Sequence, residues 1–343
     1  MLTLLRRLFS STPPASRHAA TSSRLDQAPP PDIDAGPGPA LGLVQHMRFH
    51  GGFPYMDWPR LLEWKDALPP ERRAQAWLQA EQAWLLHFRD ALGPHFRVDE
   101  SEHALLLSSL EDNVVRATLA FMEKTLKRVT HTLDGIAAMP SMGKDILIVF
   151  DDEDSYYRYV AAYYPDAGEF AFSGGMHIDA GCSHYVTLKG DLHAIEPVIA
   201  HEMTHGLLGH LPLPLWLNEG IAVNTEQRLT RVGASKHTPQ ELRQMHLAFW
   251  GEEELQQFWS GKSFQRVDDG NLLSYDLARI LVGHLAKDWD AFRRFVLAAD
   301  AADAGNAAAL EQLGVGVGEL ACALLEREPS AAWSPDPASW KQG

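Results

Sequence analysis

Residues 201–222 read His-Glu-Met-Thr-His-Gly-Leu-Leu-Gly-His-Leu-Pro-Leu-Pro-Leu-Trp-Leu-Asn-Glu-Gly-Ile-Ala, and this stretch decides the fold prediction. Its first five residues place two histidines four positions apart, on the same face of a helix. The apolar residues around them predict a buried helix, with Pro197 in its first turn and Pro212 and Pro214 beyond its end. Buried imidazoles need partners, so this arrangement favours a metal site.

Two glutamates complete the predicted chemistry. Glu202 is offset by one position, so its carboxylate lies beside the metal, where a general base takes a proton from water. A hydrolytic zinc takes three protein ligands and keeps one position open. Glu219 supplies the third, because Pro214 starts a second helix and Gly220 permits close helix packing. The predicted ligands of Zn²⁺ are therefore His201, His205 and Glu219.

His210 is the alternative third ligand. It lies five residues after His205, well round the helix from the metal-facing side. A metzincin would also need Gly at position 208 and His at position 211, where this chain has Leu208 and Leu211. We therefore favour Glu219.

The two elements together resemble the gluzincin peptidases, in which His-Glu-x-x-His is followed by a glutamate on the next helix. The segment 214–222 is similar to the Trp-Leu-x-Glu-Gly-x-Ala element of gluzincin aminopeptidases and of smaller peptidase-MA-like proteins. The smaller proteins are the closer match and resemble residues 100–325. The resemblance implies a zinc hydrolase whose peptide or protein substrate lies along an edge strand within 175–188.

The resemblance also implies a downstream tyrosine or histidine that steadies the oxyanion. Tyr275 matches in position, after the Asp-Asp-Gly turn at 268–270. A phenol there would stabilise charge that develops only in the transition state. A packed tyrosine at a helix start is the alternative interpretation, and His177 or His184 could serve in its place.

Two departures from the family pattern bear on activity. Only thirteen residues separate His205 from Glu219, so any subsite built in that connection would be missing. The segment ending Gly174-Gly-Met-His177 has no glutamate, whereas the aminopeptidases place one there to hold the free amine of the substrate. Endopeptidase activity is therefore favoured over aminopeptidase activity.

Two other functions remain open on the sequence. The chain could be a catalytically silent zinc-binding interaction module, although the presence of Glu202 disfavours this, since a structural zinc needs no base. It could also be a zinc hydrolase of non-peptide amides or esters, which shares the same chemistry.

We expect an α+β fold, with a zincin-like domain that has a small mixed sheet followed by a mainly helical C-terminal part. The expected elements are strands at 102–110, 145–150, 175–179 and 184–188, helices at 112–133 and 156–163, the latter ended by Pro165, and helices from 190 to 325. We expect a disordered basic and Pro-rich tail at 1–40, followed by a helical lead-in segment at 41–99, in which the pattern is helical from Pro59 to about His95. A gluzincin-type hydrolase domain is expected at 100–329 and a C-terminal tail at 330–343.

Composition limits the partners. Thirty basic against forty-five acidic residues give a net charge of −15, which argues against a nucleic acid partner. No run reaches the roughly 18 apolar residues of a transmembrane helix. The two cysteines fit a cytoplasmic location, and the Arg- and Ser-rich N-terminus offers organellar import as the alternative. The sequence does not determine the oligomeric state.

Overall fold

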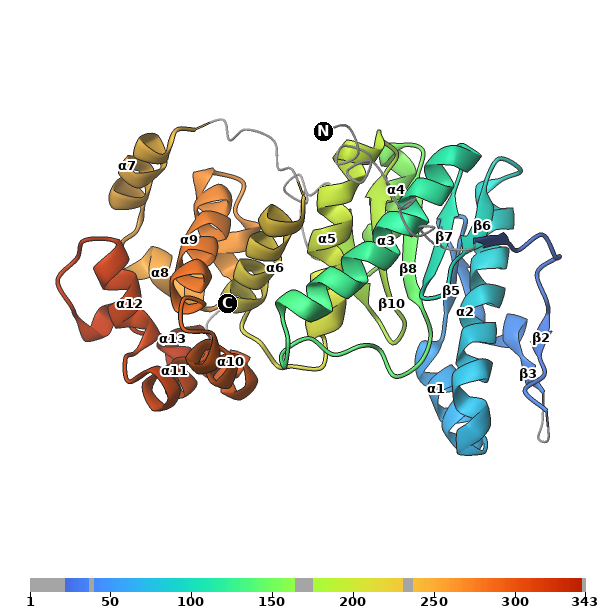
Figure 1. The fold of residues 1–343 in the computed structure, drawn as a ribbon, viewed down its shortest axis with the longest axis horizontal. Coiled ribbons are helices and arrows are strands. Elements are labelled where there is room, and N and C mark those ends of the chain that lie inside the picture. Colours follow the sequence, from blue (N-terminus) through green and yellow to red (C-terminus); the bar gives the residue numbers. More distant parts are fainter. Residues whose placement is uncertain (1–21, 37–39, 164–174, 231–236, 341–343) are drawn as a thin grey trace, which may run out of the picture.

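A six-stranded mixed sheet and a set of C-terminal helices make up this computed structural model, which describes residues 22–36, 40–163, 175–230 and 237–340 (Figure 1). The strand order is β1-β6-β7-β8-β10-β9, parallel across β7, β8 and β10 and antiparallel elsewhere. The predicted α+β class is therefore confirmed. The strands are β1 (Ser23–Arg24), β6 (Arg97–Glu100), β7 (Ala104–Ser108), β8 (Asp145–Phe150), β9 (Gly175–Asp179) and β10 (Ser183–Leu188).

Both faces of the sheet are covered. Helices α3 (Asp112–Thr132) and α5 (Leu192–Leu208) lie on one face, and α2 (Pro70–Leu92) lies on the other (Figure 1). Side chains alternate along β8, so Leu147 and Val149 join the core beneath α3 and α5. Its remaining apolar side chains face α2, which explains why the strand reads as an unbroken apolar run.

The sheet face that α2 covers also packs against smaller elements, most of them from the N-terminal part of the chain. These are β2 (Asp32–Ile33), β3 (Leu41–Gly42), η1 (Leu43–His46), β4 (Met47–His50), β5 (Phe53–Met56), α1 (Trp58–Ala67) and α4 (Glu153–Val160). Trp84 of α2 donates from Nε1 to the carbonyl of Pro54, over 2.9 Å, and thereby ties this layer together. Pro69 and Pro70 end α1 and start α2, so the single helix predicted at 59–95 is two helices.

The chain after α5 is helical, as predicted. Trp216 of α6 is fully buried among these helices and donates a hydrogen bond from Nε1 to the carbonyl of Ala304, over 3.0 Å. That bond fixes α6 against the later helices. The elements are α6 (Leu215–Leu229), α7 (Pro239–Phe249), α8 (Glu252–Trp259), η2 (Lys262–Gln265), α9 (Asp269–Leu285), α10 (Trp289–Ala298), η3 (Ala301–Asp303), α11 (Asn306–Leu313), α12 (Val317–Leu324), η4 (Ala331–Trp333) and α13 (Pro337–Trp340).

The predicted disorder of residues 1–40 is wrong for the part that the structure describes. β1 pairs with β6 at the edge of the main sheet, and β2 pairs with β3. Leu25 and Ile33 are buried, so a few apolar contacts and main-chain pairing order this segment in spite of its prolines. Residues 1–21, 37–39 and 341–343 lie outside the described residues, as do Pro165 and Gly174.

The two other predicted limits also need correction. A boundary at residue 100 would separate β6 from β7, which are hydrogen-bonded neighbours, and residues 41–99 include strands as well as helices. The described part of the predicted C-terminal tail, residues 330–340, packs on α8, where Trp259 Nε1 donates to the carbonyl of Trp333 and Trp340 Nε1 to Gln256. No domain boundary therefore falls at residue 100, and the described residues after 330 pack against the helical core.

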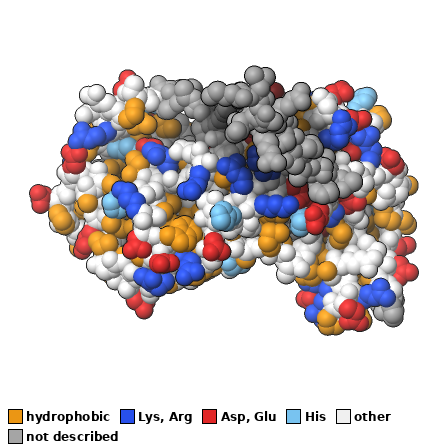
Figure 2. All heavy atoms as spheres, viewed as in Figure 1, with side chains coloured by type: hydrophobic (Ala, Val, Ile, Leu, Met, Phe, Trp, Pro, Cys, Tyr) orange, Lys and Arg blue, Asp and Glu red, His pale blue; other side chains and the backbone are white. Residues whose placement is uncertain are grey.

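Two surface properties bear on the predicted partners. Among the described residues no single helix is both long and apolar enough to cross a membrane. Helices α11 and α12 are long and apolar enough only when taken together, and their axes are bent by 84° at the break between them. Acidic, basic and apolar side chains are interspersed on the face drawn in Figure 2. The net negative charge is thus not gathered into one patch on that face.

Gly220 allows α6 and α9 to touch. A Cβ at this position would lie 2.5 Å from the backbone oxygen of Ala278 and 2.6 Å from Val282 Cγ2. The predicted close helix approach at Gly220 is therefore confirmed, and the partner is α9.

We expect Gly220→Ala to reduce the free energy of unfolding by about 1–3 kcal/mol, because the backbone of α9 has to move. Urea denaturation measures the change. Gly206→Ala is the matched control, since its Cβ would meet its nearest neighbours at 3.7 Å, and it should be neutral or stabilising by up to about 1 kcal/mol. A Gly220→Ala protein as stable as the wild type would contradict this account of the packing.

Candidate metal centre

Helix α5 carries three of the predicted site residues. It starts at Leu192, with Asp191 accepting from the N–H of Ala194, one turn earlier than the sequence suggested. Pro197 therefore lies in the second turn and not in the first, because the Asp191 cap extends the helix at its N-terminus. The packing of α5 against β9, β10, α3 and α6 buries the next two turns.

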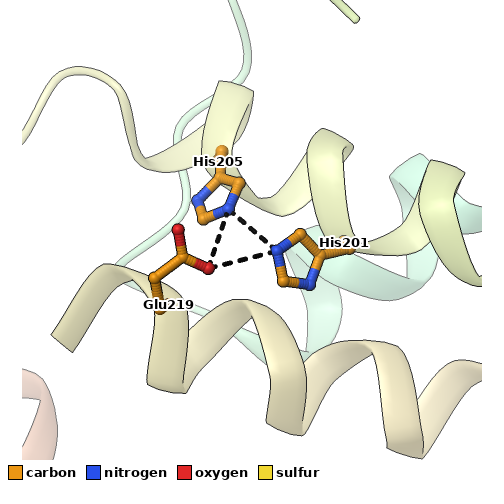
Figure 3. A group of neighbouring side chains, drawn as sticks. All are labelled: His201, His205 and Glu219. Carbon is orange, nitrogen blue, oxygen red and sulfur yellow. Dashed lines mark hydrogen bonds and ion pairs between the residues drawn. The ribbon is translucent and has the colours of Figure 1, made fainter. Parts of the chain in front are cut away.

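The two histidines and Glu219 point toward one another (Figure 3). His201 Nε2 lies 3.1 Å from His205 Nε2 and 3.2 Å from Glu219 Oε2, and the third side of this triangle is 3.5 Å. Ligands about 2.0–2.2 Å from a tetrahedral zinc lie about 3.3–3.6 Å apart. The three atoms therefore fit one metal ion with little adjustment.

The other nitrogen of each imidazole is already engaged. His201 Nδ1 lies 3.1 Å from Glu226 Oε2, and His205 Nδ1 lies 3.0 Å from Asn218 Oδ1. Both oxygens are acceptors, so each Nδ1 carries a proton, and each Nε2 presents a lone pair whenever its ring is neutral. Two lone pairs therefore face each other and the Glu219 carboxylate.

Such a set of atoms needs a positive charge among them. Glu219 Oε2 is buried, and the nearest groups that can donate to it are the two Nε2 atoms at 3.2 and 3.5 Å, which do so only when their rings are protonated. Burial lowers the pKa of His201, but Glu219 and Glu226 outweigh it and hold that pKa well above its usual value. Burial raises the pKa of Glu219, but the two histidines lower it by more, so this pKa lies below its usual value. A metal cation at the centre of the triangle would supply the positive charge that these atoms need, and a His-His-Glu donor set suits zinc.

Glu202 lies beside this triangle without belonging to it. It is 7% exposed, and its carboxylate accepts a hydrogen bond from the backbone N–H of His177 on β9. Burial raises the pKa of Glu202, which makes the carboxylate a stronger base. Its position between α5 and β9 agrees with the predicted role of a general base.

Tyr275 lies on α9, with its ring 5.1 Å from the ring of Phe264. Burial raises its pKa well above the usual range, and the carboxylates of Glu219 and Glu202 raise it further. The phenol is therefore protonated and close enough to both carboxylates to sense their charge. These properties suit a hydrogen-bond donor to an oxyanion.

The alternative histidines have different surroundings. His184 lies on the far face of the sheet from α5, buried, with Nε2 bonded to the hydroxyl of Tyr159 at 2.8 Å, so it does not reach the site. His177 does reach it: its ring centroid is 6.4 Å from that of His205, and Nε2 lies 2.7 Å from Ser183 Oγ. Burial, followed by the charge of His205, lowers the pKa of His177 to about 3, so its ring is neutral.

Two other possible ligand groups are disfavoured. His210 is exposed beyond the end of α5 and does not join the triangle. Glu102, His103 and Glu123 form a second group of suitable spacing. The carboxylate of Glu123, however, already accepts from Ser101 Oγ, from the backbone N–H of His103 and from its ring, so it stabilises the turn between β6 and β7.

Sequence reasoning missed Asn218 and Glu226, which orient the two histidines. Both lie on α6 with Glu219, and Glu226 follows Glu219 by seven residues, two turns along the same face. That spacing was the available signal. It does not distinguish an orienting carboxylate from a solvated one unless the placement of α5 is known.

No protein-family model matches this chain, and no curated protein matches its sequence. The gluzincin resemblance therefore rests on the two helices that carry His201, Glu202, His205 and Glu219.

We expect about one zinc ion per chain after metal-replete purification and desalting, measured by elemental analysis. His201→Ala should lose the zinc and Glu219→Ala should weaken its retention, because each removes one of three ligands. His210→Ala is the matched control and should keep it. Equal zinc in the wild type and His201→Ala would rule out this site.

Glu226→Gln should weaken zinc affinity by about 10–100-fold, because a neutral amide holds the His201 ring less firmly and makes it less basic. Competition with a chromophoric chelator measures this. Glu196→Gln, at a half-buried position of α5 where the carboxylate lies 4.0 Å from His193 Nδ1, changes the charge equally and should leave the affinity unchanged. Wild-type affinity in Glu226→Gln would mean that the contact does not orient the ligand.

Proposed function

We propose that this chain is a zinc-dependent hydrolase of peptide bonds, with the metal held by His201, His205 and Glu219. The observation that carries the proposal is the buried triangle of two Nε2 atoms and one carboxylate oxygen, in which Glu219 Oε2 has no neighbouring donor other than a protonated imidazole. A zinc ion held there supplies Lewis acidity, which lowers the pKa of bound water and polarises a carbonyl group.

Glu202 is placed to move the proton in this reaction. Its carboxylate lies beside the ligand triangle, anchored by the backbone N–H of His177, and burial strengthens it as a base. In the proposed mechanism Glu202 takes a proton from the attacking water and then delivers it to the leaving amine. Tyr275, protonated and near enough to the same carboxylates to feel their charge, would donate to the oxygen on which negative charge develops.

The edge strand β9 favours a peptide as the substrate. β9 pairs with β10 on one side, and within the described residues no strand pairs with its other side. The backbone N–H of His177 reaches Glu202, which places β9 next to the general base. An extended peptide added to this edge would therefore pass the metal ligands.

The composition of β9 favours an endopeptidase over an aminopeptidase. A Cβ at Gly175 would collide with Val198 and with the backbone oxygen of Val186, so this position has no room for a side chain. His177 stands where the aminopeptidases have their amine-binding glutamate, and its neutral ring cannot neutralise an ammonium group. The chain thus has no carboxylate on β9 at that position.

The two alternatives make different demands. A silent zinc-binding module has no use for a buried carboxylate beside the ligands, and burying Glu202 without a role is costly. A hydrolase of non-peptide amides or esters would use the same residues but would not need the open edge of β9.

Glu202→Gln should keep its zinc and reduce turnover by about 10²–10⁴-fold, because the amide cannot accept the proton. The assay compares N-terminally blocked fluorogenic peptides with aminoacyl amides and aryl esters, and Glu196→Gln is again the control. Full activity in zinc-loaded Glu202→Gln would exclude the mechanism. A zinc-loaded wild type that cleaves none of these substrates would support the silent module.

A further inference from the structure

A cavity of about 640 Å³ lies on the opposite side of α6 from the metal ligands. It is bounded by the C-terminal end of α3 and by α6, α9 and α10, which converge in Figure 1. Ile221, Thr225 and Arg228 of α6 line it, and at 100° per residue they lie on the face opposite Glu219. Its volume is within the range of small-molecule sites, about 300–1,000 Å³.

The inner wall of this cavity is apolar and partly aromatic. Ile221, Val282 and Phe292 are buried there, and the ring of Trp289 packs on that of Phe292, with centroids 5.7 Å apart. An aromatic or branched aliphatic group would therefore be removed from water on entering.

A polar acceptor lies at the rim. Asn224 Nδ2 donates to the carbonyls of Gly220 and Arg279, at 2.7 and 2.9 Å, so the amide orientation is fixed. Its Oδ1 is turned toward Gly283, where a Cβ would lie only 3.2 Å away. The missing side chain at Gly283 keeps this oxygen accessible from the cavity.

Two cations stand at the opening. Arg228 and Lys287 are exposed, and in the described part of the chain neither lies within ion-pair distance of a carboxylate. Lys287 Nζ lies 3.5 Å from His284 Nδ1. Asp134 is the one carboxylate among the described lining residues. In a chain of net charge −15, a cavity mouth with excess positive charge favours an anionic group.

We propose that this cavity is a second binding site, separate from the metal centre, for a small molecule with an apolar ring or branched body and one anionic group. The body occupies the wall of Ile221, Trp289 and Phe292. The anion lies between Arg228 and Lys287, and a hydroxyl or N–H of the ligand can donate to Asn224 Oδ1.

The test uses two matched probes. 8-Anilinonaphthalene-1-sulfonate has an apolar body and one anion, and N-phenyl-1-naphthylamine is the same body without the sulfonate. Fluorescence titration and calorimetry on the full chain should give one saturable site for the sulfonate, with a dissociation constant on the order of 10 μM. The neutral probe should bind at least about tenfold more weakly, since it lacks the charge-assisted contact.

Variants then locate the site. Arg228→Glu/Lys287→Glu should weaken the sulfonate at least about tenfold, and Gly283→Leu should block both probes. Arg116→Glu/Lys124→Glu, two exposed cations of α3, is the charge-matched control and should bind as the wild type does. Zinc content and circular dichroism should be unchanged in every variant, which separates this result from the fate of the proposed hydrolase.

Equal affinity for the sulfonate in the wild type and in Arg228→Glu/Lys287→Glu would overturn the proposal. Several weak, non-saturating sites, or full binding in Gly283→Leu, would overturn it as well.

Discussion

The convergence of three lone pairs in a buried space is the constraint on which the rest of this structure depends. His201, His205 and Glu219 present three acceptor atoms within 3.5 Å of one another. Without a positive charge between them, repulsion and lost hydration would separate α5 from α6. In the proposed site, binding of a metal would therefore be coupled to the packing of these two helices, as in other proteins whose metal sites contribute to folding.

Two glycines bring the surrounding elements close enough to form the site. Gly175 lets β9 approach α5, so the backbone of the edge strand reaches the carboxylate of Glu202. Gly220 lets α6 approach α9, which carries Tyr275. Gly220 adjoins Glu219 in the sequence, so one residue projects toward the candidate site while the next packs against α9.

The sequence predicted which side chains of α5 and α6 lie together better than it predicted the limits of the ordered segments. The ligand residues follow from helical periodicity and local spacing, which a sequence displays directly. Strand β8 was predicted to the residue, since its apolar run is bounded by Lys144 and Asp151. Residues 22–36 were misjudged, because their order comes from main-chain pairing: β1 pairs with β6, more than seventy residues away, and β2 pairs with β3 across a segment rich in proline and glycine.

The contacts of Asn218 and Glu226 with the two histidines could not be predicted from the sequence either, because they depend on how α5 packs against α6. A glutamate on a helix face is usually solvated, and only the approach of α5 turns Glu226 into a partner of His201. Its value also depends on the metal: an imidazole held by a carboxylate is a better ligand and keeps one tautomer. A helix that supplied only a third ligand would need neither partner. That α6 supplies all three residues fits the proposed site, in which the ring orientation of both histidines would matter because one ligand position is kept open for reaction.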